Sequence, residues 1–191
     1  MMDRDVITVV SGLPRSGTSM MMKMLEAGGM PILTDHIRTP DEDNPKGYYE
    51  YERVKKLKED NTWLGEAQGK VVKIISQLLF YLPPTYRYKV IFMRRKMEEI
   101  LASQRQMLIR RGKPTDTVSD ERMAELFGQH LRRVEAWLDE RPNMDVIYVD
   151  YNEVLREPLP HVKRVNEFLG HALDVEKMLS VIDPALYRQR R

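Results

Sequence analysis

Short apolar runs alternate along the chain with longer stretches in which apolar residues recur every three or four positions. The short runs are rich in β-branched residues, as in strands covered on both faces, and the longer stretches are typical of amphipathic helices. The predicted strands span residues 6–10, 30–33, 71–75, 89–93 and 146–149. The predicted helices span residues 17–27, 51–60, 96–111 and 120–141, and a last helix runs through Val162 and ends at Gly170. This alternation predicts a three-layer α/β fold with a central parallel sheet of about five strands, in a single domain over residues 1–191.

Composition narrows the class of protein. The chain has 191 residues, which is long enough to bury a full core. Its 31 basic and 29 acidic residues nearly balance, so charge does not indicate a nucleic acid or an anionic membrane as partner. The chain has no cysteine and no run of the roughly 18 apolar residues that a membrane span needs. Because charged residues at positions 3–5 lead straight into the first strand, we expect no signal peptide and a cytoplasmic protein.

The turn between the first predicted strand and the first predicted helix carries the clearest candidate chemistry. It reads SGLPRSGTS over residues 11–19, and its backbone N–H groups and helix N-terminus favour an anion. The spacing of Gly12 and Gly17 matches that of a nucleotide-binding phosphate loop, but Thr18 stands where the lysine of that loop is expected. The cation of the turn is Arg15 instead. The turn therefore predicts a cradle for a phosphate-like group in something other than an ordinary ATPase; the alternative is a strand–helix turn without a ligand.

Two arginines end the strand predicted at residues 89–93. Arg95 is followed eight residues later by Ser103 on the next predicted helix. A guanidinium can bind a phosphate through two parallel hydrogen bonds, and a hydroxyl adds a neutral donor. Arg94 is the weaker candidate because successive side chains of a strand point to opposite faces. Asp150, after the last predicted strand, resembles the acid that holds magnesium in nucleotide hydrolases, a role that the absent loop lysine disfavours.

The sequence PRSGTS at residues 14–19 resembles the 5′-phosphosulfate loop of the P-loop sulfotransferases. The Arg95–Ser103 spacing is similar to the pair with which that family binds a 3′-phosphate, and residues 150–170 resemble its late strand–helix segment. The resemblance implies a P-loop fold that transfers a sulfuryl group from 3′-phosphoadenosine 5′-phosphosulfate (PAPS), without a metal, to a hydroxyl or amine. The product nucleotide would be adenosine 3′,5′-bisphosphate (PAP). The implied acceptor is a small molecule such as a carbohydrate or a phenol, and neither a nucleic acid nor a membrane is expected as partner.

The resemblance also assigns roles to residues of this chain. Arg15 is the cation for the leaving phosphate oxygen, and the loop holds the 5′-phosphate. Larger members complete the 3′-phosphate site with a late Arg-Lys-Gly segment, which this sequence lacks, so Arg188 is the candidate substitute. The expected nucleotide-binding residues are Pro14, Arg15, Ser16, Gly17, Thr18, Ser19, Arg95, Ser103 and Arg188.

A general base for the acceptor is expected in the polar segment DEDNPKGYYE at residues 41–50, which resembles a segment of bacterial sulfotransferases. Glu50 is the first choice, because Tyr48 and Tyr49 can partly desolvate it, and His36 is the second. Lys46 is the candidate support for the sulfuryl oxygens. The alternative for Glu50 is a purely structural role in the acidic first turn of the following helix.

Two other functions remain open on this sequence. A small-molecule kinase would share the loop skeleton but would need ATP, magnesium and the loop lysine. A non-catalytic nucleotide-binding protein on the same fold would be favoured if no carboxylate or imidazole lay near the loop.

Overall fold

A parallel four-stranded sheet forms the centre of the computed structural model, which describes residues 4–35, 49–115 and 117–182. The strands are β1 (Val6–Gly12), β2 (Val71–Lys73), β3 (Arg87–Arg94) and β4 (Met144–Asp150), in the order β2-β1-β3-β4. Each neighbouring pair is parallel. The α/β fold with a parallel sheet is thus confirmed, and the carboxyl ends of all four strands meet at one edge.

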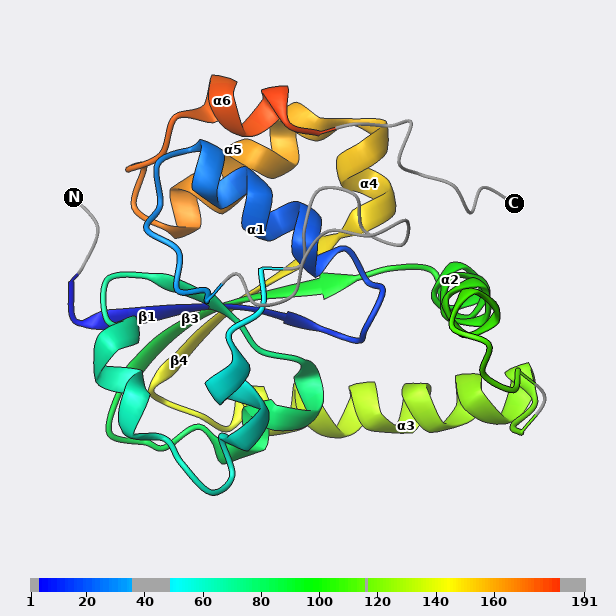
Figure 1. Cartoon of the computed structure of the whole chain (residues 1–191). Helices are drawn as coiled ribbons and strands as arrows, with labels where there is room; N and C mark the ends of the chain where they lie inside the picture. Colours follow the sequence, from blue (N-terminus) through cyan, green and yellow to red (C-terminus); the bar gives the residue numbers. More distant parts are fainter. Residues whose placement is uncertain (1–3, 36–48, 116, 183–191) are drawn as a thin grey trace.

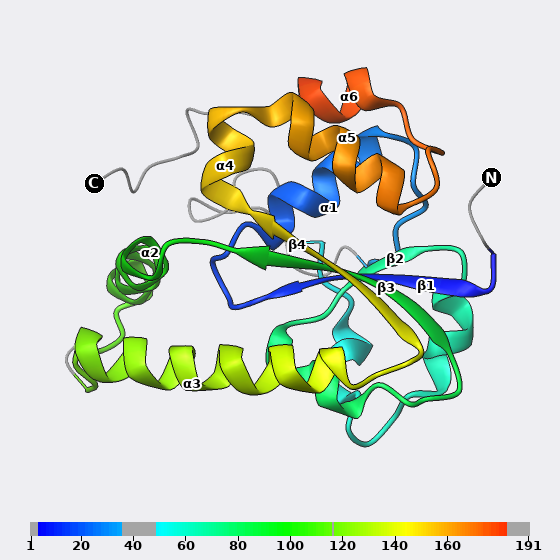
Figure 2. The same cartoon turned by 180° about the vertical axis from the view of Figure 1, so that it is seen from behind.

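Helices cover both faces of this sheet (Figures 1 and 2). One layer holds α1 (Thr18–Ala27), α4 (Tyr151–Arg156), α5 (Pro158–Phe168) and α6 (Val175–Ser180). The other holds α3 (Asp120–Asp139) and the 3₁₀ helices η1 (Glu52–Lys56), η2 (Thr62–Ala67) and η3 (Ser76–Tyr81). The helix α2 (Met97–Arg110) follows β3 and lies beyond the carboxyl ends of the strands (Figure 1).

Each layer buries its own apolar cluster against the sheet. Met21, Met24 and Leu25 of α1 pack with Val162 and Val165 of α5 in the first layer. In the second layer the largest buried side chains are Trp63 and Tyr88, which belong to one cluster with Val134 and Leu138 of α3. The β-branched residues of the strands therefore face apolar partners on both sides, as the sequence predicted.

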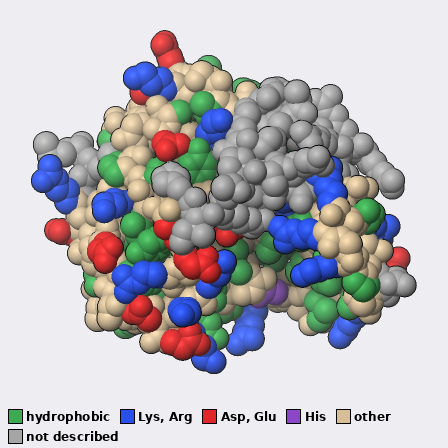
Figure 3. Space-filling model, viewed as in Figure 1, with side chains coloured by type: hydrophobic (Ala, Val, Ile, Leu, Met, Phe, Trp, Pro, Cys, Tyr) green, Lys and Arg blue, Asp and Glu red, His purple; other side chains and the backbone are tan. Residues whose placement is uncertain are grey.

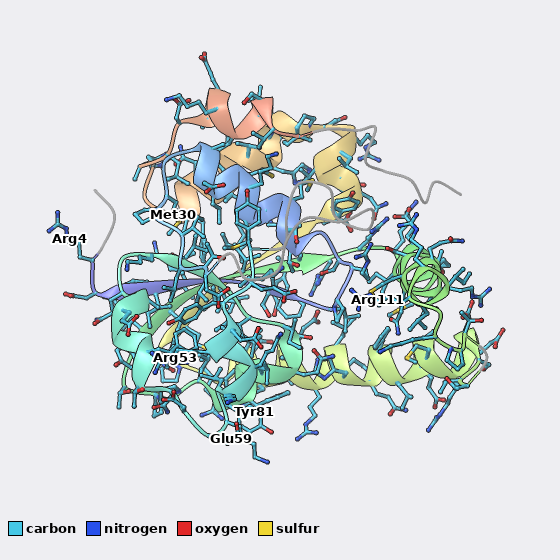
Figure 4. The ribbon with its side chains drawn as sticks, in the orientation of Figure 1. Arg4, Met30, Arg53, Glu59, Tyr81 and Arg111 are labelled. Carbon is cyan, nitrogen blue, oxygen red and sulfur yellow. The ribbon has the colours of Figure 1, made fainter. Side chains whose placement is uncertain are left out.

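The prediction of a fifth strand at residues 30–33 is wrong. That segment makes only an isolated bridge between Ile32 and Val71, beside β2. Two local features keep it from pairing further. The N–H of Met30 still caps α1 by donating to the carbonyl of Leu25, and Pro31 has no N–H to donate. Met30 itself lies where the chain descends from α1 toward the sheet (Figure 4).

The α-helix predicted over residues 51–60 is replaced by the shorter η1. Its hydrogen bonds join residues three apart, as from the N–H of Val54 to the carbonyl of Tyr51 and from Leu57 to Val54. Tyr51, Val54 and Leu57 all contribute to the second-layer core. An apolar spacing of three matches the 3₁₀ period, so burial favours the tighter helix here.

Candidate functional site

The β1–α1 loop (residues 13–17) has a backbone shape that few residue types adopt. Gly12 and Gly17 flank it with φ angles of 145° and 98°, and Arg15 has a left-handed φ of 71°. A Cβ on Gly12 would lie 2.7 Å from the carbonyl oxygen of Met93, and one on Gly17 would lie 2.4 Å from the ring of Tyr151. Both glycines are therefore required by close approach as well as by φ. The left-handed conformation of Arg15 costs on the order of 1 kcal/mol, so its surroundings must stabilise it.

The loop closes on itself through Ser16. Its N–H and its hydroxyl both donate to the carbonyl of Leu13, at 3.2 and 2.6 Å, and its side chain is buried. Ser16 thus shapes the turn from within. The helix α1 begins immediately afterwards at Thr18, with Ser19 in its first turn. Since the first N–H groups of a helix have no intrahelical acceptor, they are available to an anion at this end.

Three residues singled out from the sequence meet at this loop. The Nε of Arg15 donates to the Oγ of Ser103 on α2 at 2.8 Å, across 88 positions of the chain. The Nη1 of Arg95 donates to the backbone carbonyl of Arg15 at 2.9 Å. The ends of β1 and β3 thereby bring both guanidinium groups and the hydroxyl together. Because Ser103 accepts from Arg15, its own hydroxyl hydrogen can still be donated to an anionic oxygen.

Sequence reasoning missed the residues that surround Arg95. Its Nε donates to the Oε2 of Glu99 at 2.9 Å, and both side chains are buried. The other carboxylate oxygen of Glu99 accepts from Asn152 at 2.9 Å, and the Arg95 guanidinium lies 4.6 Å from the centre of the Tyr151 ring. The spacing of four between Arg95 and Glu99 was a usable signal, because an arginine directly before a predicted helix can reach a carboxylate in its first turn. Asn152 and Tyr151 lie too far along the chain to give one.

Lys73 was missed as well. It ends β2, and its Nζ lies 3.3 Å from the Oγ of Ser19 in the first turn of α1. A second cation therefore stands at the same end of α1 as Arg15. Its signal in the sequence was a lysine directly after two valines, inside the strand predicted at residues 71–75.

Glu50 lies at the sheet edge beside β2. Its backbone carbonyl accepts from the hydroxyl of Thr34 at 2.7 Å and from the N–H of Asp35 at 3.3 Å. These two residues directly follow the segment that bridges to Val71 of β2. These hydrogen bonds hold the backbone of Glu50 beside β2, the strand that carries Lys73. His36, Lys46 and Arg188 lie outside the described residues, as does Tyr48.

Tyr49 is oriented by α1. Its hydroxyl donates to the Oε2 of Glu26 at 2.7 Å, and burial together with this hydrogen bond raises the pKa of the Tyr49 hydroxyl. Burial also raises the pKa of Tyr151, against the opposing charge of Arg95. Both phenols therefore remain neutral at physiological pH and act as packing and hydrogen-bonding groups.

Positive charge gathers along the flank of α2 in Figure 3. Arg111, at the C-terminal end of this helix, lies on the side of α2 that faces the β1–α1 loop (Figure 4). Clustered cations raise the local concentration of anionic ligands.

Asp150, the candidate magnesium acid, caps α4 by accepting from the N–H of Glu153 at 3.0 Å. Within the described ranges, no group of three or more acidic or histidine side chains is arranged to hold a metal ion, and no helix is long and apolar enough to cross a bilayer.

A family profile described as the sulfotransferase domain matches residues 3–190. Since the match covers almost the whole sequence, the chain belongs to the sulfotransferase domain family. No curated protein matches the chain.

Solved structures of this family share its fold. The sulfotransferase domain of the olefin synthase from Synechococcus PCC 7002 superposes with a TM-score of 0.58 at 14% identity, over 97% of this chain and 87% of that domain. A sulfotransferase from Alicyclobacillus acidocaldarius gives 0.53 at 17% identity, over 94% and 87%. Mouse sulfotransferase SULT7A1, solved in complex with PAP, gives 0.55 at 16% identity, over 95% of this chain and 63% of the mouse chain. At these identities the likeness supports the fold alone.

Proposed function

We propose that this protein transfers a sulfuryl group from PAPS to a hydroxyl or amine of a small-molecule acceptor. The observation that carries the proposal is the cluster of Arg15, Ser103 and Arg95 at the N-terminus of α1. It offers cationic and hydroxyl donors beside a helix N-terminus, as a nucleotide with two separate phosphates requires. Membership of the sulfotransferase family supports the sulfuryl group as the one transferred.

In the proposed reaction the acceptor oxygen or nitrogen attacks the sulfur in line with the bond to the 5′-phosphate. A bond from the acceptor to sulfur forms, the bond from sulfur to the phosphate oxygen breaks, and PAP leaves with that electron pair. Negative charge grows on the leaving oxygen, and fixed cationic donors stabilise it most in the transition state. Arg15 takes this role, and Lys73, at the same end of α1, is placed to neutralise the sulfuryl or phosphate oxygens.

The nucleotide's two phosphates are assigned to different donors. The N–H groups of residues 16–19, with the hydroxyls of Thr18 and Ser19, bind the 5′-phosphate. Pro14 restricts the backbone where the chain enters the turn. Arg95 and Ser103 bind the 3′-phosphate, and Arg188 is the candidate that completes this site.

Glu50 is the proposed general base that accepts the acceptor's proton, since its backbone is held beside the end of β2. His36 is the second candidate for the base, and Lys46 the candidate for supporting the sulfuryl oxygens. For either base the proton moves from the acceptor to the side chain as the new bond to sulfur forms.

Nucleotide choice tests the proposed function directly. Calorimetric titrations of the wild-type protein with PAP, AMP and magnesium–ATP should give the tightest binding for PAP, because only PAP offers a 3′-phosphate to Arg95 and Ser103. Thermal shift should follow the same order, since a ligand that binds only the folded protein raises the melting temperature. Magnesium-dependent ATP binding tighter than PAP binding would overturn the proposal in favour of a small-molecule kinase.

A further inference from the structure

A buried carboxylate lies beside the proposed anion site. The side chain of Glu99 is 4% exposed, and its Oε2 lies 2.9 Å from the Nε of Arg95, whose side chain is 8% exposed. A carboxylate here repels any anionic ligand, and burying it carries a desolvation cost. By itself, the Glu99 carboxylate would lower both the stability of the protein and its attraction for anions. Its hydrogen bonds indicate what it contributes in return.

Both oxygens of Glu99 act as acceptors. Oε2 accepts from Arg95, and Oε1 accepts from the side-chain amide of Asn152 at 2.9 Å. The orientation of that amide is fixed in turn, because its oxygen accepts from the backbone N–H of Lys96, which can only donate. A glutamine at position 99 has one acceptor oxygen and would turn an NH₂ group toward a second donor. A carboxylate, with an acceptor oxygen for each of the two donors, satisfies this arrangement.

Arg95, held in position by Glu99, in turn contacts the β1–α1 loop. With its Nε held by Glu99, its Nη1 reaches the carbonyl of Arg15 at 2.9 Å. That carbonyl belongs to the residue with the left-handed φ of 71°, so a charge-assisted hydrogen bond stabilises the strained point of the loop. The side chain of Arg15 then reaches Ser103, four residues after Glu99 on the same face of α2. Arg95, just before α2, and Ser103 within it thus contact Arg15 twice, once at its backbone carbonyl and once at its side chain.

The start of α4 supports the same arrangement from the other side. Tyr151, next to Asn152, packs its ring 4.6 Å from the Arg95 guanidinium and against Gly17 of the loop. From these contacts we propose that Glu99, oriented by Asn152, is a positioning residue that fixes Arg95 and through it the nucleotide-binding shape of the β1–α1 loop. The expected influence of Glu99 on nucleotide affinity rests on the proposed function, whereas the effect of Glu99 on the loop does not.

The test compares Glu99→Gln with Glu98→Gln, a matched change at the exposed neighbouring position of α2. Hydrogen exchange of the intact protein, followed by mass spectrometry, is read in the peptide covering residues 11–20. We expect Glu99→Gln to speed exchange in this peptide about tenfold while the peptides of β3 and α3 keep wild-type rates. PAP affinity should fall about tenfold, roughly the effect of losing one charge-assisted hydrogen bond. Glu98→Gln should change neither quantity.

Two further variants separate positioning from general destabilisation. Glu99→Asp keeps both acceptor oxygens and should recover part of the loop protection that Glu99→Gln loses. Asn152→Ala, which leaves the ion pair with Arg95 intact, should shift loop exchange in the same direction by a smaller factor. It also provides the readout if Glu99→Gln does not fold. In the double variant Glu99→Gln/Arg95→Gln, PAP affinity should equal that of Arg95→Gln alone, because Glu99 acts through Arg95.

Three results would overturn the positioning role: wild-type loop exchange in both Glu99→Gln and Asn152→Ala, faster exchange spread over the whole protein, or additive losses in the double variant. A wild-type protein that does not bind PAP would overturn the proposed function instead. The loop exchange of the two variants, measured without ligand, would still decide for or against the role of Glu99.

Discussion

Arg94 and Arg95 are neighbours at the end of β3, yet they belong to different regions of the molecule. Arg94 points to the layer of α3, where its side chain is 46% exposed. It pairs at 2.8 Å with Glu135, which is 29% exposed, and stacks 4.0 Å from the centre of the Tyr148 ring. Arg95 turns to the layer of α1 and α4, where it is buried against Glu99 and donates to the loop carbonyl of Arg15. One residue type, repeated once, supplies a surface ion pair and part of the candidate site.

The difference between the two sides lies in what each guanidinium touches. A solvent-exposed pair such as Arg94–Glu135 contributes at most about 1 kcal/mol, since water competes for both charges. A buried guanidinium that holds a strained backbone cannot be replaced so easily, because its loss leaves a carboxylate and a carbonyl without their partner. The comparison therefore predicts that function depends on the Arg95 side and that the Arg94 side contributes to stability only.

The largest effect should come from Glu50, the proposed general base. Glu50→Gln keeps the shape of the side chain and removes its basic function, so turnover should fall by roughly 10²–10⁴-fold. PAP affinity and melting temperature should hold. The measurement uses labelled PAPS with any acceptor found by screening alcohols, phenols and amines. His36→Gln is the control and should cost less; near wild-type turnover in Glu50→Gln would move the base to His36.

A somewhat smaller loss of turnover is expected for Arg15→Ala. The proposed charge on the leaving oxygen is largest in the transition state, so this change should lower kcat by about 10²–10³-fold and weaken PAP binding less. Arg94→Ala, assayed beside it, should leave kcat unchanged. An Arg15→Ala enzyme that loses affinity but keeps its kcat would remove Arg15 from catalysis.

The two neighbouring arginines can be compared directly in nucleotide binding. Arg95→Ala should weaken PAP by roughly 1.5–3 kcal/mol, because a charged hydrogen bond to the 3′-phosphate is lost. Adenosine 5′-phosphosulfate, which lacks that phosphate, should lose less, through the loosened loop alone. Arg94→Ala should change either affinity by less than about twofold. Calorimetry with both nucleotides would contradict the 3′-phosphate assignment if Arg95→Ala weakened them equally.

The smallest effect concerns His130 on α3, in the Arg94 layer. Its Nε2 lies 2.8 Å from the Oγ of Ser76, and burial, with the charge of Arg133 as a second cause, lowers the pKa of the His130 imidazole. The His130 imidazole therefore takes up a proton more readily in the unfolded chain than in the folded one. The stabilisation that the neutral imidazole gives the folded protein is complete above about pH 6.5 and is lost as the pH falls below it. Denaturant unfolding of wild type and His130→Gln between pH 5 and 8 should show a weaker acid loss in the variant. PAP affinity should differ little between wild type and variant. A large difference would contradict the prediction that function depends on the Arg95 side alone.

Local patterns in the sequence were enough to predict the position of the β1–α1 loop and two of the residues that meet at it, Arg95 and Ser103. A β-branched run, two glycines and a helix start were enough to place the β1–α1 turn, because each depends on residues a few positions apart. The same holds for Arg95 and Ser103, whose positions after β3 follow from the strand and the helix. The family was likewise identified from short motifs in order, and the profile match confirms it.

Two of the local predictions were wrong, one because of hydrogen bonding and one because of packing. Residues 30–33 have strand-like composition, but Pro31 and the use of Met30 to cap α1 leave only one bridge. Residues 51–60 look helical, but the burial of side chains spaced by three favours a 3₁₀ turn. In both cases hydrogen bonding or packing against a neighbouring element, together with single residues of the segment, outweighed its average composition.

The sequence by itself determined the class of fold, the glycine-flanked β1–α1 turn, and Arg15 and Arg95 as the arginines beside it, since these follow from short-range periodicity and residue chemistry. Only the tertiary structure decided which groups hold those cations in place. Glu99 and Asn152 are 53 positions apart and meet because α4 begins where β4 ends, beside the start of α2. No pattern within either segment encodes that meeting, because it depends on how parallel strands bring the following helices to the same edge of the sheet.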